Sequence, residues 1–365
     1  MARLTLFDVP ALAEPGSLDG AVAGGLGTGS FRITPAGAFT GWRMEPASRP
    51  LDQPVVHDRL HVWARRGRDT FSRPLATHRQ SRLFPFTWTE YGLADSPLVL
   101  ESAGFSPLLP GETPERSLPL YLLVFRAHNP TDDPIEAALM LTWACGWPDL
   151  LPDSEFDFQH DNLCLTGSLG SPASPNRQGI AVPDLHYAGI YQQGIEPWVV
   201  PGELDEVVED FAEDGELDPR VVRSAPHGTA AWVKFDLEPG ERKETPFVLA
   251  WHFPRYDAGP SAGAWRNYTQ YLGRHRPDNA IVWLAEQAVQ HFGAETANYK
   301  YWMQQIRDWQ EGLGPRAREV CAALEACIES GVTWPCESTP TAGPSLTTEQ
   351  LALVRSVWPD IHPLI

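Results

Sequence analysis

The feature that most constrains the fold is a long series of short apolar runs separated by Pro, Gly, Asp and Asn, which extends over residues 18–254. The chain holds 35 prolines, and proline interrupts helices, so long helices are not expected in this part. Residues 120–125 and 135–143 are two such apolar runs, and the turn-forming residues 129–134 separate them. The pattern predicts a mainly β fold, an antiparallel β-sandwich.

One later strand shows the alternation of a sheet with a buried face. Ala231, Val233, Phe235 and Leu237 alternate with bulkier or charged residues, and a turn at residues 238–241 leads to the apolar strand 247–253.

After Pro254 the apolar spacing changes to three, four or seven residues, which indicates amphipathic helices. The spacing covers residues 281–309, and Gly293 splits it into two helices. A further helix is expected to open at Pro315 and to end before Gly331. We therefore expect an N-terminal extension at 1–17, the sandwich at 18–258, a helical segment at 259–331, a linker at 332–345 and a short amphipathic helix at 346–365.

A glycine-rich stretch, Gly24 to Phe31, is expected to feed a β-hairpin that continues to Trp42. It does not match a dinucleotide-binding loop, because Ser30 stands where the third glycine belongs, and it lacks the Gly-Lys-Ser/Thr ending of a P-loop. Its local composition also fits a mobile linker.

The net charge and the cysteine content limit which classes of partner the chain can bind and which cellular compartment it suits. The net charge of −19 argues against nucleic acid as a partner. The sequence shows neither a signal peptide nor an apolar stretch long enough for a membrane span. Five scattered cysteines fit a reducing compartment, so we expect a cytoplasmic protein.

Three groups of residues are candidates for a metal site or a catalytic site. His57 and His61 have the spacing of a helical zinc pair, but the strand-like surroundings would hold the rings about 13 Å apart. Residues 203–218 hold nine carboxylates and no Lys or Arg, which indicates a solvated loop or, alternatively, a calcium site. Glu90, Asp95 and Glu101 are read as surface carboxylates rather than a glycosidase pair. We expect no metal and no cofactor.

Several segments, in order, resemble the N-terminal domain of glycoside hydrolase family 116, the β-glucosidases that include the non-lysosomal glucosylceramidase. They are GGLGTGSF at 24–31, FPFTWTEY at 84–91, AGFSPLLP at 103–110, SLP at 117–119 and LAWHFP at 249–254. Residues 265–268 and the helix that ends at Trp309 extend the resemblance, which covers residues 18–311. The last helix also resembles the first helix of a globin, as the start of a truncated further domain would, but without the haem-binding helices we expect no haem.

The resemblance implies a two-domain retaining enzyme, in which a catalytic (α/α)6 barrel carries the nucleophilic Glu and the acid/base Asp. The chain ends soon after the sandwich, so we expect no catalytic residue here, and a sandwich that is inactive alone. The implied domain-interface or substrate-facing residues are Gly24, Gly25, Gly27, Thr28, Gly29 and Trp42. The expected partner is the barrel, in cis or in trans, or a second copy of the chain, with a β-glucoside as the ligand of the complete enzyme.

Two alternatives remain at this point. The 14 tryptophans would suit a carbohydrate-binding module that stacks sugar rings. Trp42 would anchor an interface in a protein-interaction module, or would simply fill the sandwich core.

Overall fold

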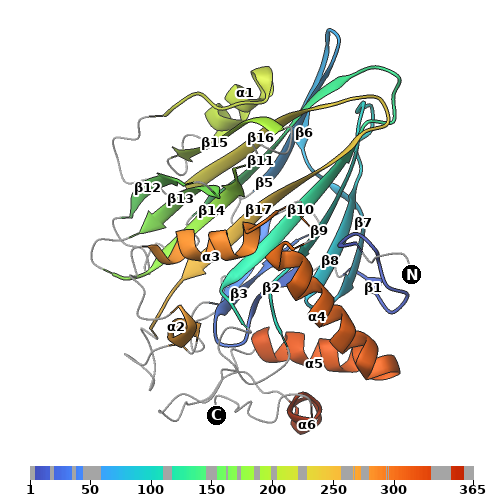
Figure 1. Cartoon of the computed structure of the whole chain (residues 1–365), viewed down its shortest axis with the longest axis vertical. Helices are drawn as coiled ribbons and strands as arrows, with labels where there is room; N and C mark the ends of the chain where they lie inside the picture. The colour runs from blue at the N-terminus through green and yellow to red at the C-terminus, as the bar shows by residue number, and fades with distance from the viewer. Residues whose placement is uncertain are drawn as a thin grey trace.

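The computed structural model describes residues 5–16, 20–34, 38–43, 59–109, 117–144, 154–161, 163–170, 174–184, 190–198, 204–220, 228–255, 266, 268–272, 279–292, 294, 296–329 and 347–356. Within them, two antiparallel sheets pack face to face, as the sequence predicts, and helices follow toward the C-terminus (Figure 1).

The larger sheet has nine strands in the order β1-β7-β8-β9-β10-β17-β14-β13-β12. Their bounds are β1 (Glu14–Pro15), β7 (Thr77–Leu83), β8 (Phe86–Tyr91), β9 (Val99–Phe105), β10 (Leu120–His128), β17 (Arg242–His252), β14 (Arg177–Pro183), β13 (Cys164–Gly170) and β12 (Glu155–His160). The first of these strands lies in the predicted N-terminal extension, so residues 14 and 15 are part of the sheet.

The second sheet has five strands in the order β15-β16-β11-β5-β6. They are β15 (Ile190–Trp198), β16 (Gly228–Leu237), β11 (Ile135–Ala144), β5 (Arg59–Arg66) and β6 (Asp69–Pro74). A small third sheet, β2 (Ala21–Gly25), β3 (Gly29–Ile33) and β4 (Phe39–Arg43), contains the glycine-rich stretch.

The central strands are apolar on both faces, because each face is covered. In β10, Tyr121, Leu123 and Phe125 point into the core between the sheets, whereas Leu120, Leu122 and Val124 face the helices. This double burial explains why the strand reads in the sequence as an unbroken apolar run rather than as an alternating one. In β16, the predicted inward set, Ala231, Val233, Phe235 and Leu237, lies in the inter-sheet core.

The C-terminal helices cover the outer face of the nine-stranded sheet (Figure 1). They are α3 (Ala280–Val289), α4 (Asn298–Leu313) and α5 (Ala317–Glu329), preceded by α2 (Tyr268–Tyr271) and followed by α6 (Thr348–Arg355). The break between α3 and α4 falls where the sequence predicts it, and a 3-10 turn at Gly314–Arg316 opens α5. Arg82 pairs with Glu325 at 3.0 Å and Arg32 pairs with Glu329, and these ion pairs tie α5 to the sheets.

The acidic run holds a helix that the sequence analysis did not predict. Residues read as a solvated loop form α1 (Leu204–Asp214), which buries Leu204, Val207 and Phe211 against the outer face of the five-stranded sheet. The three apolar residues recur at steps of three and four, so their spacing carried the signal that the carboxylates obscured.

None of the helices in the described part of the chain combines the length and apolar character that a bilayer crossing requires.

Candidate functional site

The predicted site residues lie at the turn that joins β2 to β3. Gly25 and Gly29 face each other across the hairpin, and Leu26, Gly27 and Thr28 form its three-residue loop. Gly24, Gly27 and Gly29 have φ angles of 128°, 69° and 89°, in the region that favours glycine. The predicted hairpin that continues to Trp42 is confirmed, because β3 pairs with β4. The glycine stretch itself is mostly strand rather than loop, since Gly24 and Gly25 belong to β2 and Gly29 to β3, and it forms a second hairpin built into the sandwich.

Hydrogen bonds from distant segments hold this loop. The indole Nε1 of Trp251 donates to the carbonyl of Thr28 at 2.7 Å, and the amide of Gly24 donates to Ser106 Oγ at 2.7 Å. Ser117 Oγ donates to the carbonyl of Leu26 at 3.3 Å. Arg266 Nη1 donates to the carbonyl of Gly27 at 3.4 Å.

The four partners of the loop are three donors, on Trp251, Ser117 and Arg266, and one acceptor, on Ser106. They come from four separate segments of the sequence, and the fold brings them to one loop. The close approach also explains the glycine at position 25, because a Cβ there would lie 2.2 Å from Ser117 Oγ. Thr28 is fully buried, and it closes the turn by accepting from the amide of Gly25 at 2.9 Å. Only Gly27 and Gly29 of the loop are half-buried, so a partner would meet their backbone.

Trp42 lies beneath the loop in the inter-sheet core. Its side chain has no exposed surface, and its ring stacks on Trp143 at 5.7 Å and on Phe31 at 4.6 Å between ring centroids. The structure thus places Trp42 in the core, the second of the two alternatives, so it does not itself present a surface to a partner. The physical reason is that β3 and β4 close one end of the sandwich and must fill it.

A buried basic group adjoins the loop at the end of β17. Burial, together with the nearby charges of Arg177 and Arg266, lowers the pKa of His252 to about 3. The His252 ring packs edge-on against Tyr268 at 5.8 Å, and the Tyr268 hydroxyl accepts from the amide of Phe253 at 2.9 Å. His252 is therefore neutral at physiological pH, and we assign this group to support of the loop rather than to acid–base chemistry.

Of the three carboxylates considered as a glycosidase pair, Glu90 and Glu101 form ion pairs with arginines. Glu90 and Glu101 lie opposite each other on β8 and β9, and they pair with Arg79 at 3.5 Å and Arg126 at 3.2 Å. Asp95 has a positive φ of 66° between these strands. This arrangement fits the interpretation as surface carboxylates.

The weighed metal ligands do not assemble within the part of the chain that the structure describes. His61 is buried in β5, and His57 lies outside the described residues. Two carboxylates of the acidic run are engaged in ion pairs, Asp210 with Arg220 at 3.4 Å and Glu216 with Lys234 at 2.6 Å. No cluster of three or more potential ligands occurs among the described residues.

Tryptophan platforms for sugar rings are not found on the described strands. The seven tryptophans there are at most 7% exposed: Trp42, Trp63, Trp88, Trp143, Trp198, Trp232 and Trp251. They fill the three cores instead. The exposed aromatic side chains of the described region are Phe158 on β12 and Tyr301 on α4.

Comparisons with known proteins match the chain to one family profile and to several solved structures. The family profile described as beta-glucosidase 2, glycosyl-hydrolase family 116 N-term, matches residues 20–294. Among solved structures, a bacterial glucoamylase complexed with acarbose is similar at 10% identity, with 88% of this chain covered and a TM-score of 0.42. A polysaccharide lyase is similar at 11% identity, with 67% covered and a TM-score of 0.35. This chain spans 42% and 33% of the lengths of those two chains.

Proposed function

Because the chain belongs to glycoside hydrolase family 116 through that family's N-terminal domain, we propose that it is the sandwich domain of a β-glucosidase, an enzyme of the glucosylceramidase type that hydrolyses β-glucosides. The observation that carries this proposal is the match over residues 20–294, which takes in both sheets and the glycine loop. In the proposed enzyme the reacting carboxylates belong to an (α/α)6 barrel, supplied in cis or in trans.

The arrangement of the described carboxylates supports a non-catalytic role. A retaining glycosidase needs two carboxyl groups about 5–5.5 Å apart, one of them protonated to act as the acid. Glu101 is paired with Arg126 at 3.2 Å and Glu90 with Arg79 at 3.5 Å. Both carboxylates are therefore already engaged in ion pairs within the chain, which supports a structural role for them.

The glycine-loop end is the proposed contact with the barrel. Gly27 and Gly29 are half-buried there, and the hydrogen bonds from Trp251, Ser106 and Ser117 fix the backbone that they present. A surface that is already ordered loses little conformational entropy on binding, which favours association. A second copy of the chain is the alternative occupant of this surface.

We also propose a cytoplasmic location. The support is that Cys164 and Cys321 are buried free thiols, which suits a reducing compartment.

The test combines an activity assay with an association assay. The purified chain is incubated with an aryl β-glucoside, alone and with a separately produced family 116 barrel domain, and complex formation is followed by light scattering. We expect no turnover by the chain alone and a complex with the barrel. Turnover by the chain alone, lost in Glu90→Gln or Glu101→Gln, would overturn the non-catalytic role.

A matched pair of variants tests the surface. Gly27→Asn adds a side chain at a φ of 69°, which asparagine tolerates, and we expect it to weaken the complex about tenfold or more. Gly67→Asn makes the same change at a φ of 61° in the turn between β5 and β6, where a Cβ meets open space, and should leave binding unchanged. Equal binding by both variants would remove the loop from the interface.

A further inference from the structure

A pocket of about 630 Å³ lies between the N-terminal segment, β17 and the first turns of α4. Its lining includes Thr5, Leu6, Glu244, Tyr299, Tyr301 and Gln304. The volume is within the range of small-molecule sites in proteins, about 300–1,000 Å³. None of its lining residues belongs to the glycine loop, so a ligand in this pocket would bind at a site other than the proposed contact with the barrel.

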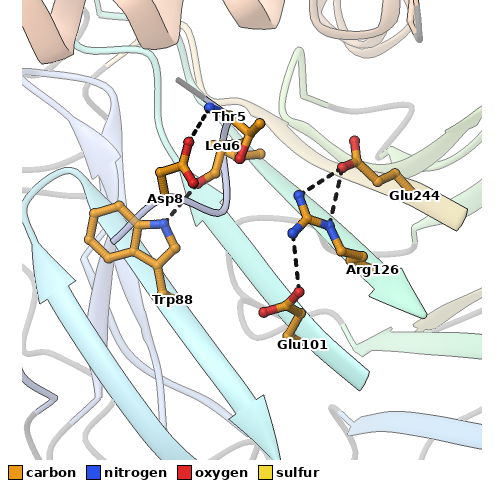
Figure 2. A network of polar contacts seen from close by, with 7 residues as sticks. All are labelled: Thr5, Leu6, Asp8, Trp88, Glu101, Arg126 and Glu244. Atoms are coloured by element: carbon orange, nitrogen blue, oxygen red, sulfur yellow. Dashed lines mark hydrogen bonds and ion pairs between the residues drawn. The ribbon is translucent and has the colours of Figure 1, made fainter. Parts of the chain in front are cut away.

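The segment that forms one wall is fixed to the sandwich. The indole Nε1 of Trp88 donates to the carbonyl of Leu6 at 2.8 Å (Figure 2). Arg307 Nη2 donates to the carbonyl of Asp8 at 2.6 Å. The amide of Thr5 in turn donates to the Asp8 carboxylate. The wall is therefore preformed, which is typical of binding sites.

The Glu244 carboxylate is oriented by an arginine. Arg126 lies on β10 opposite both Glu244 and Glu101, and its Nη2 and Nε reach Glu244 Oε1 at 3.1 and 3.3 Å (Figure 2). Its guanidinium also packs 3.7 Å from the centroid of the Phe7 ring, which holds it in place. A carboxylate can accept about four hydrogen bonds, so Glu244 keeps capacity for donors from a ligand.

Two tyrosines on α4 also line the pocket, of which Tyr299 is buried and Tyr301 is exposed. Tyr299 is buried and stacks on Phe292 at 5.4 Å, and burial followed by the charge of Glu244 raises its pKa, which keeps the phenol protonated as a donor. Tyr301 is 61% exposed and offers an accessible aromatic face at the same pocket. Gln304 adds a side-chain amide to the lining.

The charges around the pocket favour a neutral ligand. Arg126 is paired with both Glu101 and Glu244, and the two charged residues of the lining, Glu244 and Lys300, have opposite signs. A charged ligand would leave one of these charges uncompensated, whereas hydroxyl groups can bond to carboxylate, phenol and amide together. A ring with apolar C–H faces can at the same time pack on an aromatic side chain.

From this arrangement we propose that the pocket binds a neutral carbohydrate, with its hydroxyls on Glu244, Tyr299 and Gln304 and a ring face against Tyr301. The proposal goes beyond the proposed function, since it requires neither the barrel nor catalysis.

Calorimetric titration of the full chain with cellobiose and with maltose tests the proposal, and glycerol serves as a polyol without a ring. We expect saturable binding of at least one disaccharide and none of glycerol. Tyr301→Ala should weaken the binding about threefold to tenfold, the range for an aromatic contact. Glu244→Gln should weaken it about tenfold, because hydrogen bonds to a charged acceptor are the stronger ones.

Phe158→Ala is the matched control, since this aromatic side chain is 47% exposed on β12, away from the pocket lining. Circular dichroism and the melting temperature verify that each variant is folded. An unchanged affinity in Tyr301→Ala and Glu244→Gln, or an equal loss of affinity in Phe158→Ala, would overturn the proposal. So would a wild-type chain that takes up neither disaccharide up to its solubility limit. These readouts do not depend on complex formation with the barrel.

Discussion

Trp251 donates its indole hydrogen to the carbonyl of Thr28 across 2.7 Å, and the two residues stand 223 positions apart in the chain. The bond joins the end of β17, a central strand of the nine-stranded sheet, to the turn of the glycine loop. The edge of the Trp251 ring also meets Phe31 at 5.3 Å. One side chain therefore couples the order of the loop to the sandwich core.

We expect Trp251→Phe to cost more than the loss of ring volume alone, because the buried Thr28 carbonyl would lose its donor. An unsatisfied buried acceptor costs about 1–3 kcal/mol. Trp143→Phe is the control: this ring is equally buried in the same core, and its Nε1 has no hydrogen-bond partner among the described residues. Urea unfolding should show the larger loss in Trp251→Phe, and equal losses would contradict the role of the bond.

Gly25 and Ser117 should be energetically coupled. A Cβ at position 25 would lie 2.2 Å from Ser117 Oγ but 3.4 Å from Ser117 Cβ. Gly25→Ala is therefore expected to destabilise the chain by about 1–3 kcal/mol through overpacking. Ser117→Ala removes the clashing oxygen and should restore part of that loss in the double variant. A double-mutant cycle on unfolding free energies measures the coupling, and simple additivity would contradict the geometry.

His61 should make the fold sensitive to acid. Burial, with a smaller effect of Arg59, lowers its pKa to about 4, and both ring nitrogens are buried without a hydrogen-bond partner among the described residues. The unfolded chain takes up this proton near pH 6.5, so between about pH 6.5 and 4 it binds more protons than the folded chain. Stability is therefore lost as the pH falls, by up to about 3 kcal/mol for this residue.

The measurement is the free energy of unfolding against pH for the wild type and His61→Leu. The variant should show a shallower slope across this interval, and the remaining slope includes His252, whose lowered pKa acts in the same direction. Val62→Ala, at a buried apolar position on the same strand, is the control: it removes no titrating group and should keep the wild-type slope. An unchanged slope in His61→Leu would contradict the prediction.

One ion pair joins the segment just after α1 to the five-stranded sheet, and the packing of α1 on that sheet should depend on it. Lys234 Nζ lies 2.6 Å from Glu216 Oε1 and 5.3 Å from the centroid of the Trp63 ring, and the lysine side chain is only 8% exposed. Glu216→Gln leaves this ammonium group without its counter-charge, and we expect a loss of about 2 kcal/mol, reduced from the fully buried case by the partial exposure of Glu216.

Lys234→Met should cost less than Glu216→Gln, because an apolar chain fits the same buried site without a charge. Glu136→Gln, in the more exposed pair with Arg65 at 2.6 Å, is the surface reference with an expected loss of about 0–1 kcal/mol. Thermal unfolding orders the three variants. If Glu216→Gln loses no more stability than Glu136→Gln, the ion pair does not support the packing of α1.

Much of the architecture follows from local patterns. The spacing of three and four residues in α3, α4 and α5 reports which side of each helix is buried, and alternation in β16 reports which residues face the inter-sheet core. The other face of β16 is buried as well, in the cluster that includes α1, and the alternation did not show this. The helix α1 was missed because its charge dominated the interpretation, although Leu204, Val207 and Phe211 carry helical spacing. Which face of a sheet a helix covers is not encoded in the helix alone.

The sequence by itself determined the antiparallel strands, the glycine hairpin and the family, because these depend on short-range periodicity, backbone freedom and ordered motifs. Only the tertiary structure decided the role of Trp42, since a large aromatic residue suits a core and an interface equally well. Trp42 lies in the core because Trp143, which is distant in the chain, stacks on the Trp42 ring inside the sandwich. The same holds for the pocket, where Thr5, Glu244 and Tyr301 meet only because β17 and α4 pack beside the N-terminal segment.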